Sequence, residues 1–217
     1  MVYNQEIMKK IYFVRHGESE GNAARIHQSK DTPLSEIGRS QAKIVALRFG
    51  KIQADGIIAS PYYRAQETAQ AIATKKQLKV ESNELFAERR GPSELIGISQ
   101  LSEQSKQIRA ELSQHLLDAN GTWRYSDEEN ALEFTQRATK ALDFLHQRSE
   151  ENLIVVCHAL ILRMIFAKIL NPHGDLANLY DIYGNFDLNN TSLSVAAYDH
   201  EKQAWQMICI NDHSHLG

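Results

Sequence analysis

Short apolar runs alternate with longer stretches of helical spacing along most of the chain. The apolar runs are rich in β-branched and aromatic residues and end at polar residues, which is typical of buried strands. The predicted strands are 10–14, 54–60, 153–156, 192–198 and 204–210. The last two alternate enough to form an antiparallel pair, and the weakly periodic stretch 77–95 is predicted as another strand followed by an exposed loop.

Between these strands, apolar residues three and four positions apart predict helices. Ser60 is predicted to cap one helix, with Pro61 at its first position. Ser126 and Glu129 form a capping-box pattern before another helix. The helical stretches are 35–51, 101–117 and 160–170, and two more helices carry the apolar faces 65–72 and 131–145.

Strands that alternate with helices predict an α/β fold, a three-layer α/β/α sandwich with a mostly parallel central sheet. The late hairpin would add an antiparallel edge to that sheet. A chain of 217 residues suits one domain, 1–217. Residues 84–125 interrupt the regular alternation and are predicted to form an inserted loop or helical cap.

Composition narrows the function classes. The net charge of −3 gives no reason to expect nucleic-acid binding, and no apolar run approaches the ~20 residues that a membrane span needs. Residues 1–10 lack the apolar core of a signal peptide, so a cytoplasmic location is the default expectation. Cys157 and Cys209 lie in apolar runs and are predicted to be buried free thiols.

Two of the predicted strands end in the same way, one at Arg15-His16 and the other at Cys157-His158. A single histidine after a strand is most often structural. Two histidines at matching strand ends, with arginines nearby, favour a shared site instead, because ligands of α/β sheets bind beyond the carboxyl ends of the strands. A neutral imidazole is a competent phosphoryl acceptor, and guanidinium groups bind phosphoryl oxygens in planar, bidentate geometry.

Arg64 is a second candidate for phosphate binding, near the start of the helix that follows strand 54–60. A surface pair with Glu67, three residues on, is the alternative explanation for it. His16 and His158 lack a third and fourth ligand at a recognised metal spacing, so we expect no metal and no other cofactor.

The order of these motifs along the chain resembles that of a known family. The run Arg15–Ser19 after an apolar strand resembles the signature of the histidine phosphatase superfamily, which includes the cofactor-dependent phosphoglycerate mutases. The resemblance covers most of the chain, in matching order: Asn22 in the phosphate loop, 31–42 as D-x-P-L-S-x-x-G-x-x-Q-A, 60–69 as S-P-x-x-R-A-x-x-T-A, 155–158 before the second histidine, and 190–192.

The resemblance implies roles for individual residues. His16 would be the nucleophile, with Arg15, Arg64 and His158 binding the phosphoryl group and Asn22 assisting. A carboxylate would protonate the leaving oxygen and later activate water. Glu88 fits the family's place for this acid, while a loop carboxylate paired with Arg89 or Arg90 is the alternative explanation.

The chain departs from the family pattern in three places. Ala159 follows His158 where glycine is usual, and Cys157 stands where serine is frequent. After Glu88, residues 89–97 replace the usual Gly-aromatic-Glu-Gly stretch, which leaves Glu94 as a second candidate acid. Arg25, Arg89 and Arg90 could select an anionic substrate, although ordinary surface charge explains Arg25 equally well.

The sequence therefore predicts a metal-independent phosphomonoesterase that acts on a small phosphorylated metabolite through a phosphohistidine on His16. Two alternatives remain open at this point. One is mutase-type phosphoryl transfer, and the other is a non-catalytic phospho-ligand binding domain. The absence of long insertions around the pocket favours hydrolysis over mutase action. The natural substrate and the oligomeric state, with a homodimer as one option, are also left open.

Overall fold

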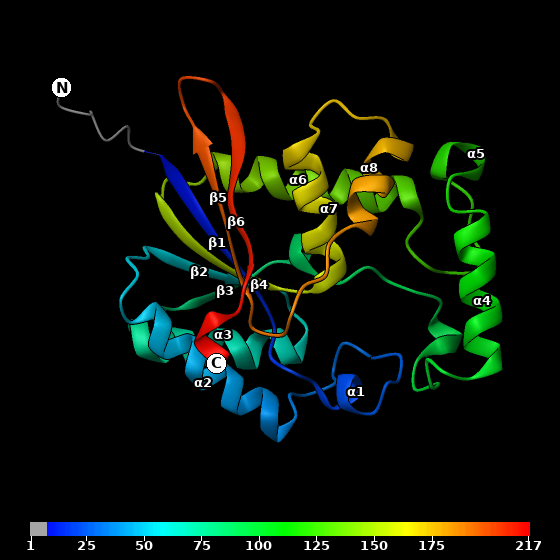
Figure 1. Cartoon of the computed structure of the whole chain (residues 1–217), viewed down its shortest axis with the longest axis horizontal. Helices are drawn as coiled ribbons and strands as arrows, with labels where there is room; N and C mark the ends of the chain where they lie inside the picture. The colour runs from blue at the N-terminus through cyan, green and yellow to red at the C-terminus, as the bar shows by residue number, and fades with distance from the viewer. Residues whose placement is uncertain (1–7) are drawn as a thin grey trace.

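One mixed sheet runs through the centre of the structure, a computed structural model that describes residues 8–217 (Figure 1). Its strands lie in the order β3-β2-β4-β1-β5-β6. The first four are parallel, and β5 and β6 are antiparallel to their neighbours, which confirms the predicted sheet with an antiparallel edge. The strands are β1 (Lys9–Arg15), β2 (Gly56–Ala59), β3 (Val80–Ser82), β4 (Asn152–Cys157), β5 (Leu193–Asp199) and β6 (Ala204–Asp212).

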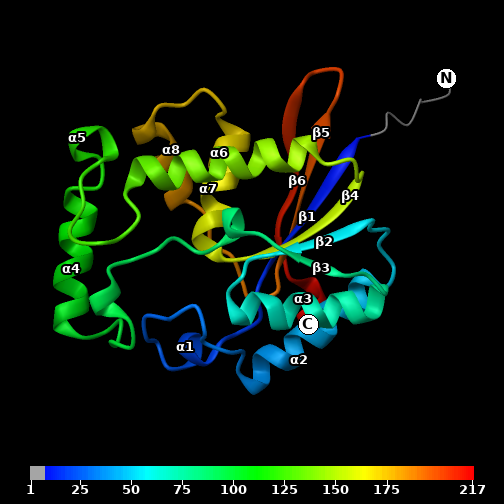
Figure 2. The same cartoon turned by 180° about the vertical axis from the view of Figure 1, so that it is seen from behind.

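Helices cover both faces of this sheet, as the predicted three-layer α/β/α architecture requires (Figures 1 and 2). One face packs on α2 (Glu36–Phe49) and α3 (Tyr63–Lys76). The other packs on α6 (Ala131–Gln147), α7 (Ala159–Leu170) and α8 (Leu176–Gly184). The remaining elements are α1 (Glu20–Ala23), α4 (Glu103–Gln114), α5 (Asp118–Gly121), η1 (Glu84–Phe86), η2 (Ser93–Leu95) and η3 (Ser214–Leu216).

The buried strands β1 and β4 position the site. Ile11, Phe13 and Val155 are fully buried between the helical layers, as near-continuous apolar runs in a parallel sheet require. The register pairs Arg15 with Cys157, so the two strands end side by side. The residues that follow, His16 and His158, therefore enter the same edge of the sheet.

Two predicted helix starts are wrong by a few residues. Helix α6 begins after Asn130, whose side chain forms a capping box with Glu133, and not at Ser126. Asn130 caps the helix in place of Ser126 because residues 125–128 form a separate turn. In that turn the Glu128 carboxylate accepts the backbone N–H groups of Tyr125 and Ser126.

Helix α3 begins after Tyr62, which makes no side-chain cap, and the predicted cap Ser60 lies outside the helix. The Ser60 hydroxyl is instead directed to His158. Helix α8, capped by Asp175, was not predicted, because the short segment before it contains Pro172 and Gly174 and reads as a loop.

Other predictions can be placed directly. Segment 84–125 contains η1, η2, α4 and α5, and the latter two lie to one side of the sheet and its covering helices in both views (Figures 1 and 2). Cys157 is buried and Cys209 half-buried, and both are free thiols. No helix within residues 8–217 is long and apolar enough to cross a membrane. The prediction on a leader segment concerns residues 1–10, of which 1–7 lie outside the described residues.

Candidate active site

The two histidines form the centre of a buried polar cluster at the carboxyl ends of β1 and β4. Their ring centroids lie 5.0 Å apart. His16 is 3% exposed and His158 is fully buried. A polar group buried this deeply needs hydrogen bonds, so the partners of each ring nitrogen define its chemistry.

The loop after β1 is fixed by contacts to α2 and α3. The Gly17 N–H donates to Thr68 Oγ1 at 3.1 Å, and the Glu18 N–H donates to Gln41 Oε1 at 2.8 Å. A Cβ atom on Gly38 would lie 1.8 Å from the Glu18 carbonyl oxygen, so only glycine allows this close approach of α2. The spacing of Gly38, Gln41 and Thr68 in the sequence thus serves to hold the His16 loop.

His16 has one ring nitrogen committed and one available. Nδ1 lies 2.6 Å from the Gly17 carbonyl oxygen, which can only accept, so Nδ1 carries the proton. Nε2 then has a lone pair, and the Arg64 Nε–H points to it at 3.3 Å. In this tautomer Nε2 is the ring atom with a lone pair, so it is the atom of His16 that could act as a nucleophile.

His158 is held by a serine that the sequence analysis assigned to a helix cap. Ser60 Oγ lies 2.7 Å from His158 Nε2 and also accepts the Tyr62 N–H at 3.2 Å. If the Ser60 hydroxyl donates to Nε2, the proton of the neutral ring lies on Nδ1. That Nδ1 atom is buried and has no hydrogen-bond partner in the described residues, so it is free to donate to a bound anion.

Two guanidinium groups flank the histidines. Arg64 is 3% exposed, donates from Nη1 to the Ser29 carbonyl at 3.0 Å and lies 5.1 Å from the Tyr62 ring centroid. Arg15 donates from Nη1 to the Leu188 carbonyl, and its Nε is buried without a partner among residues 8–217. Each cation is anchored through a backbone carbonyl and keeps other N–H donors for a ligand. Together they form a buried cationic cluster whose N–H donors suit a phosphoryl group.

The same environment keeps both histidines neutral. Burial lowers the pKa of His16 well below 6.5, and the positive charges of Arg64 and Arg15 lower it further, against the bond to Gly17. Burial likewise lowers the pKa of His158, with contributions from Arg64, His16 and Arg15. Near pH 7 the His16 lone pair is therefore available for nucleophilic attack.

This neutrality predicts a stability that falls in acid. Below pH 6.5 the unfolded chain binds a proton on each histidine that the folded chain does not bind, so the free energy of unfolding should decrease by about 1.4 kcal/mol per pH unit for each one. Urea titrations between about pH 7.5 and about pH 5 measure this slope. His158→Gln removes one of the two groups and should reduce this slope by about 1.4 kcal/mol per pH unit. An unchanged slope in that variant would contradict the assignment.

Glu88 caps the first turn of α7. Its carboxylate accepts the Leu160 N–H at 3.2 Å and the Ile161 N–H at 3.1 Å, in the first turn of the helix that starts directly after His158. Its charge raises the pKa of both Arg15 and Arg64, against the lowering by burial. Glu88 therefore belongs to the same electrostatic cluster as the phosphate-binding candidates.

Glu94, the second candidate acid, lies elsewhere. It is exposed on η2. Its charge adds to the effect of burial in raising the pKa of Tyr125. Glu94 lies in the 3₁₀ turn Ser93–Leu95, on the segment that leads to α4. Geometry thus favours Glu88 over Glu94 as the carboxylate of the site.

Asn22 has a structural bond in addition to its proposed role. Its Oδ1 accepts the N–H and the hydroxyl of Ser19, at 3.2 and 2.8 Å, and closes the capping box of α1. The Nδ2 donors are the part of the side chain that could bind a phosphoryl oxygen. The late segment 190–192 also reaches the site, because Asn190 Nδ2 donates to the His16 carbonyl at 2.9 Å.

The three further arginines differ in placement. Arg25 and Arg90 are exposed, and Arg90 donates to the Asp127 carbonyl at 3.1 Å. Arg89 is half-buried, with its guanidinium 5.4 Å from the Phe134 ring centroid. Across residues 8–217, no group of three or more His, Cys, Asp or Glu side chains is arranged to hold a metal ion.

Known proteins share sequence with most of this chain. A sequence profile described as "Histidine phosphatase superfamily (branch 1)" matches residues 11–213. A "Probable phosphoglycerate mutase GpmB" from Yersinia enterocolitica is 30% identical over 219 residues, which cover 96% of this chain and 95% of the relative.

Solved structures show the same fold. YhfR of Bacillus stearothermophilus superposes with a TM-score of 0.80 at 22% identity, over 96% of this chain and 99% of the other. A phosphoserine phosphatase from Entamoeba histolytica, in complex with 3-phosphoglyceric acid, gives a TM-score of 0.73 at 21% identity, over 96% and 99% of the two chains.

Proposed function

The chain belongs to the histidine phosphatase superfamily, and from this premise we propose that it hydrolyses small phosphate monoesters through a phosphohistidine on His16. The observation that carries the proposal is the state of His16. Its Nδ1–H is tied to the Gly17 carbonyl, and its Nε2 lone pair lies beside the Arg64 guanidinium and the His158 ring. A domain that only bound phosphate would need donors here, not a lone pair.

In the first step, His16 Nε2 attacks the phosphorus atom. An N–P bond forms while the ester P–O bond breaks. Glu88 enters this step as the carboxylic acid, gives its proton to the departing oxygen and is left as a carboxylate. Arg15 and Arg64 bind the equatorial phosphoryl oxygens, where charge accumulates in the transition state. His158 Nδ1–H and Asn22 Nδ2–H supply further donors.

In the second step, water attacks the phosphohistidine. The Glu88 carboxylate takes a proton from that water as the new P–O bond forms. The N–P bond breaks, and its electron pair returns to Nε2 of His16. Inorganic phosphate then leaves, and the enzyme is back in its starting protonation state. No step in this sequence requires a metal ion.

The name of the Yersinia relative favours a second candidate, the transfer of the phosphoryl group to another hydroxyl of the same substrate. The two activities share the first step and differ only in what accepts the phosphoryl group from His16. Small differences in water access therefore decide between them, and the products must be measured.

We expect hydrolysis without metals. The enzyme should be incubated with 3-phosphoglycerate and 2,3-bisphosphoglycerate, and with a panel of sugar phosphates, nucleotides and phosphoamino acids, always with EDTA present. Free phosphate and both phosphoglycerate isomers are then followed. Phosphate release that persists in EDTA supports the proposal. Rapid isomer exchange with little phosphate would establish the mutase, and activity restored only by added metal would refute metal independence.

A further inference from the structure

Arg137 and Glu129 form an ion pair, and the two residues contact the backbone on either side of Glu88, the proposed general acid. Arg137, on α6, donates from Nε and Nη2 to the two carboxylate oxygens of Glu129, each at 2.7 Å. The Arg137 side chain is 17% exposed and that of Glu129 is 12% exposed. The guanidinium also lies 5.3 Å from the Phe134 ring centroid, so its plane is fixed on a third side.

The remaining donor of Arg137 reaches the backbone immediately before Glu88. Nη1 donates to the Leu85 carbonyl at 3.0 Å and to the Ala87 carbonyl at 2.7 Å. Glu88 follows Ala87 directly. One guanidinium therefore fixes the orientation of the peptide groups that lead into the Glu88 side chain.

Glu129 anchors the chain on the other side of Glu88. Its N–H donates to the Arg90 carbonyl at 2.9 Å, and its own carbonyl accepts from the Arg89 guanidinium at 3.4 Å. The backbone before Glu88 is thus bonded to the Arg137 guanidinium, and residues 89 and 90 are bonded to the main chain of Glu129, whose side chain pairs with the same guanidinium. The Glu88 carboxylate itself contacts the start of α7, so little of residues 85–90 is left to move independently.

From these contacts we propose that Arg137 and Glu129 are positioning residues for the reaction, which hold Glu88 where it can reach the leaving oxygen. The inference rests on the proposed function and on the acid role of Glu88 within it. Proton transfer requires the two heavy atoms within hydrogen-bond reach, and a displacement of about 1 Å can cost about 100-fold in rate. A buried ion pair is weak evidence for stability, whereas its fork geometry is well suited to holding two carbonyls and a carboxylate at fixed angles.

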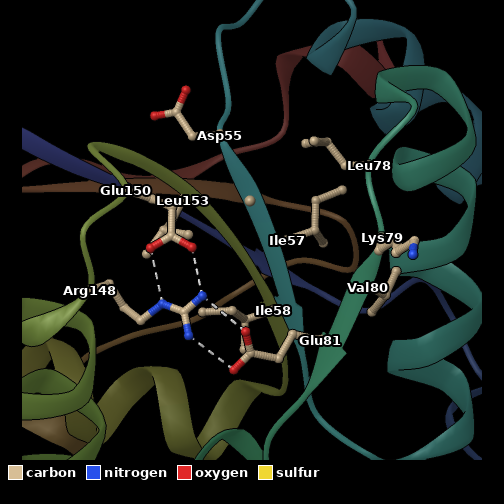
Figure 3. Close-up of a pocket in the computed structure, with 11 residues that line it drawn as sticks. Asp55, Ile57, Ile58, Leu78, Lys79, Val80, Glu81, Arg148, Glu150 and Leu153 are labelled. Carbon is tan, nitrogen blue, oxygen red and sulfur yellow. Dashed lines mark hydrogen bonds and ion pairs between the residues drawn. The ribbon is translucent and has the colours of Figure 1, made fainter.

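The chain offers a matched control at the other end of the strands. Arg148 forms an equivalent fork, with Nε and Nη2 bonded to the two carboxylate oxygens of Glu150 and a further ion pair to Glu81 (Figure 3). These residues line a hollow beside the amino-terminal ends of β2, β3 and β4, while the site lies at the carboxyl ends. Loss of Arg148 removes a similar ion pair without touching Glu88.

The test compares two substrates in the first chemical step. An alkyl phosphate such as glycerol phosphate needs its leaving oxygen protonated, and p-nitrophenyl phosphate does not. Single-turnover measurements on the full chain would use Arg137→Met, Arg137→Lys and Glu129→Gln, with Arg148→Met as the control and Glu88→Gln as the reference. Thermal unfolding of every variant separates loss of stability from loss of rate.

We expect Arg137→Met to slow phosphoryl transfer from the alkyl ester by about 10- to 100-fold and from the aryl ester by less than about threefold. Arg137→Lys and Glu129→Gln, which keep part of the bonding, should show the same selectivity with a smaller loss. Arg148→Met should lower stability without changing the ratio of the two rates. If Arg137→Met does not fold, the two milder variants decide.

Equal losses on both substrates in the Arg137 and Glu129 variants, with Glu88→Gln still selective, would overturn the positioning role alone. A non-selective Glu88→Gln would overturn the acid assignment and this inference with it. Phosphoenzyme formation on His16 from the aryl ester is recorded in the same series. Its absence in the unmodified protein would refute the proposed function itself.

Discussion

His16→Ala should lower phosphatase activity by at least about 10⁴-fold while the protein stays folded. The substitution removes the Nε2 lone pair that faces the Arg64 guanidinium, and no other group in the site offers an equivalent nucleophile at neutral pH. Arg15, Arg64 and His158 would still bind the ester, so KM should change far less than kcat. Steady-state kinetics with the best ester from the substrate panel measure both constants.

Trapping of the intermediate makes the test specific to His16. Brief incubation with a radiolabelled ester and an alkaline quench should preserve label on the unmodified protein, because phosphohistidine survives base and is lost in acid. The variant should carry none. His115→Ala is a suitable control, since this histidine follows α4 and pairs with Asp118 at the start of α5. Activity of His16→Ala above about a tenth of the unmodified enzyme would eliminate His16 as nucleophile.

The sequence predicted the centre of the site because the relevant signals are local. Apolar runs mark β1 and β4 as buried strands, and polar residues mark where each one ends. The topology then brings these ends together, through the pairing of Arg15 with Cys157. Burial of the two rings and the lowering of their pKa values follow from that register and could not be read from either strand alone.

Ser60 shows why local signals fail at a functional position. A serine before proline after a strand is a good helix cap by propensity, and the helix indeed begins three residues later. In the fold, however, β2 and β4 are neighbours, and the Ser60 hydroxyl meets the buried Nε2 of His158. A hydrogen bond to that buried nitrogen stabilises the fold more than a helix cap would. An unsatisfied buried polar group costs more free energy than a helix end that water can solvate.

Nothing in the sequence indicated the contacts of Arg137, and Glu129 was predicted only as part of a capping box with Ser126. Helix α6 was recognised from the apolar stripe that packs on the sheet, and a charged residue beside that stripe is ordinarily a solvated one. The partners of Arg137 are backbone carbonyls about fifty positions away, at Leu85 and Ala87. Contacts between a side chain and a distant carbonyl carry no residue-type signature, so only the three-dimensional structure reveals them.

Glu88→Gln has the second largest expected effect, and the effect should depend on the leaving group. Glutamine keeps the size of the side chain and can still meet the first turn of α7 with its amide oxygen, while it has no proton to transfer. Hydrolysis of an alkyl phosphate should therefore slow by about 10²- to 10⁴-fold, since its alkoxide is a poor leaving group. Formation of the phosphoenzyme from p-nitrophenyl phosphate should be affected much less, because nitrophenolate departs without a proton.

The burst of nitrophenol separates the two steps in this variant. Its amplitude and rate should stay near those of the unmodified enzyme, while the following turnover slows because the same carboxylate activates the attacking water. Glu94→Gln should leave both the burst and the following turnover unchanged. Glu94 is exposed on η2, where its charge adds to the effect of burial in raising the pKa of Tyr125. Equal slowing of the burst and of alkyl ester cleavage in Glu88→Gln would mean that Glu88 serves only to bind the phosphoryl group or to hold α7. A loss confined to Glu94→Gln would move the acid role to the segment that leads to α4.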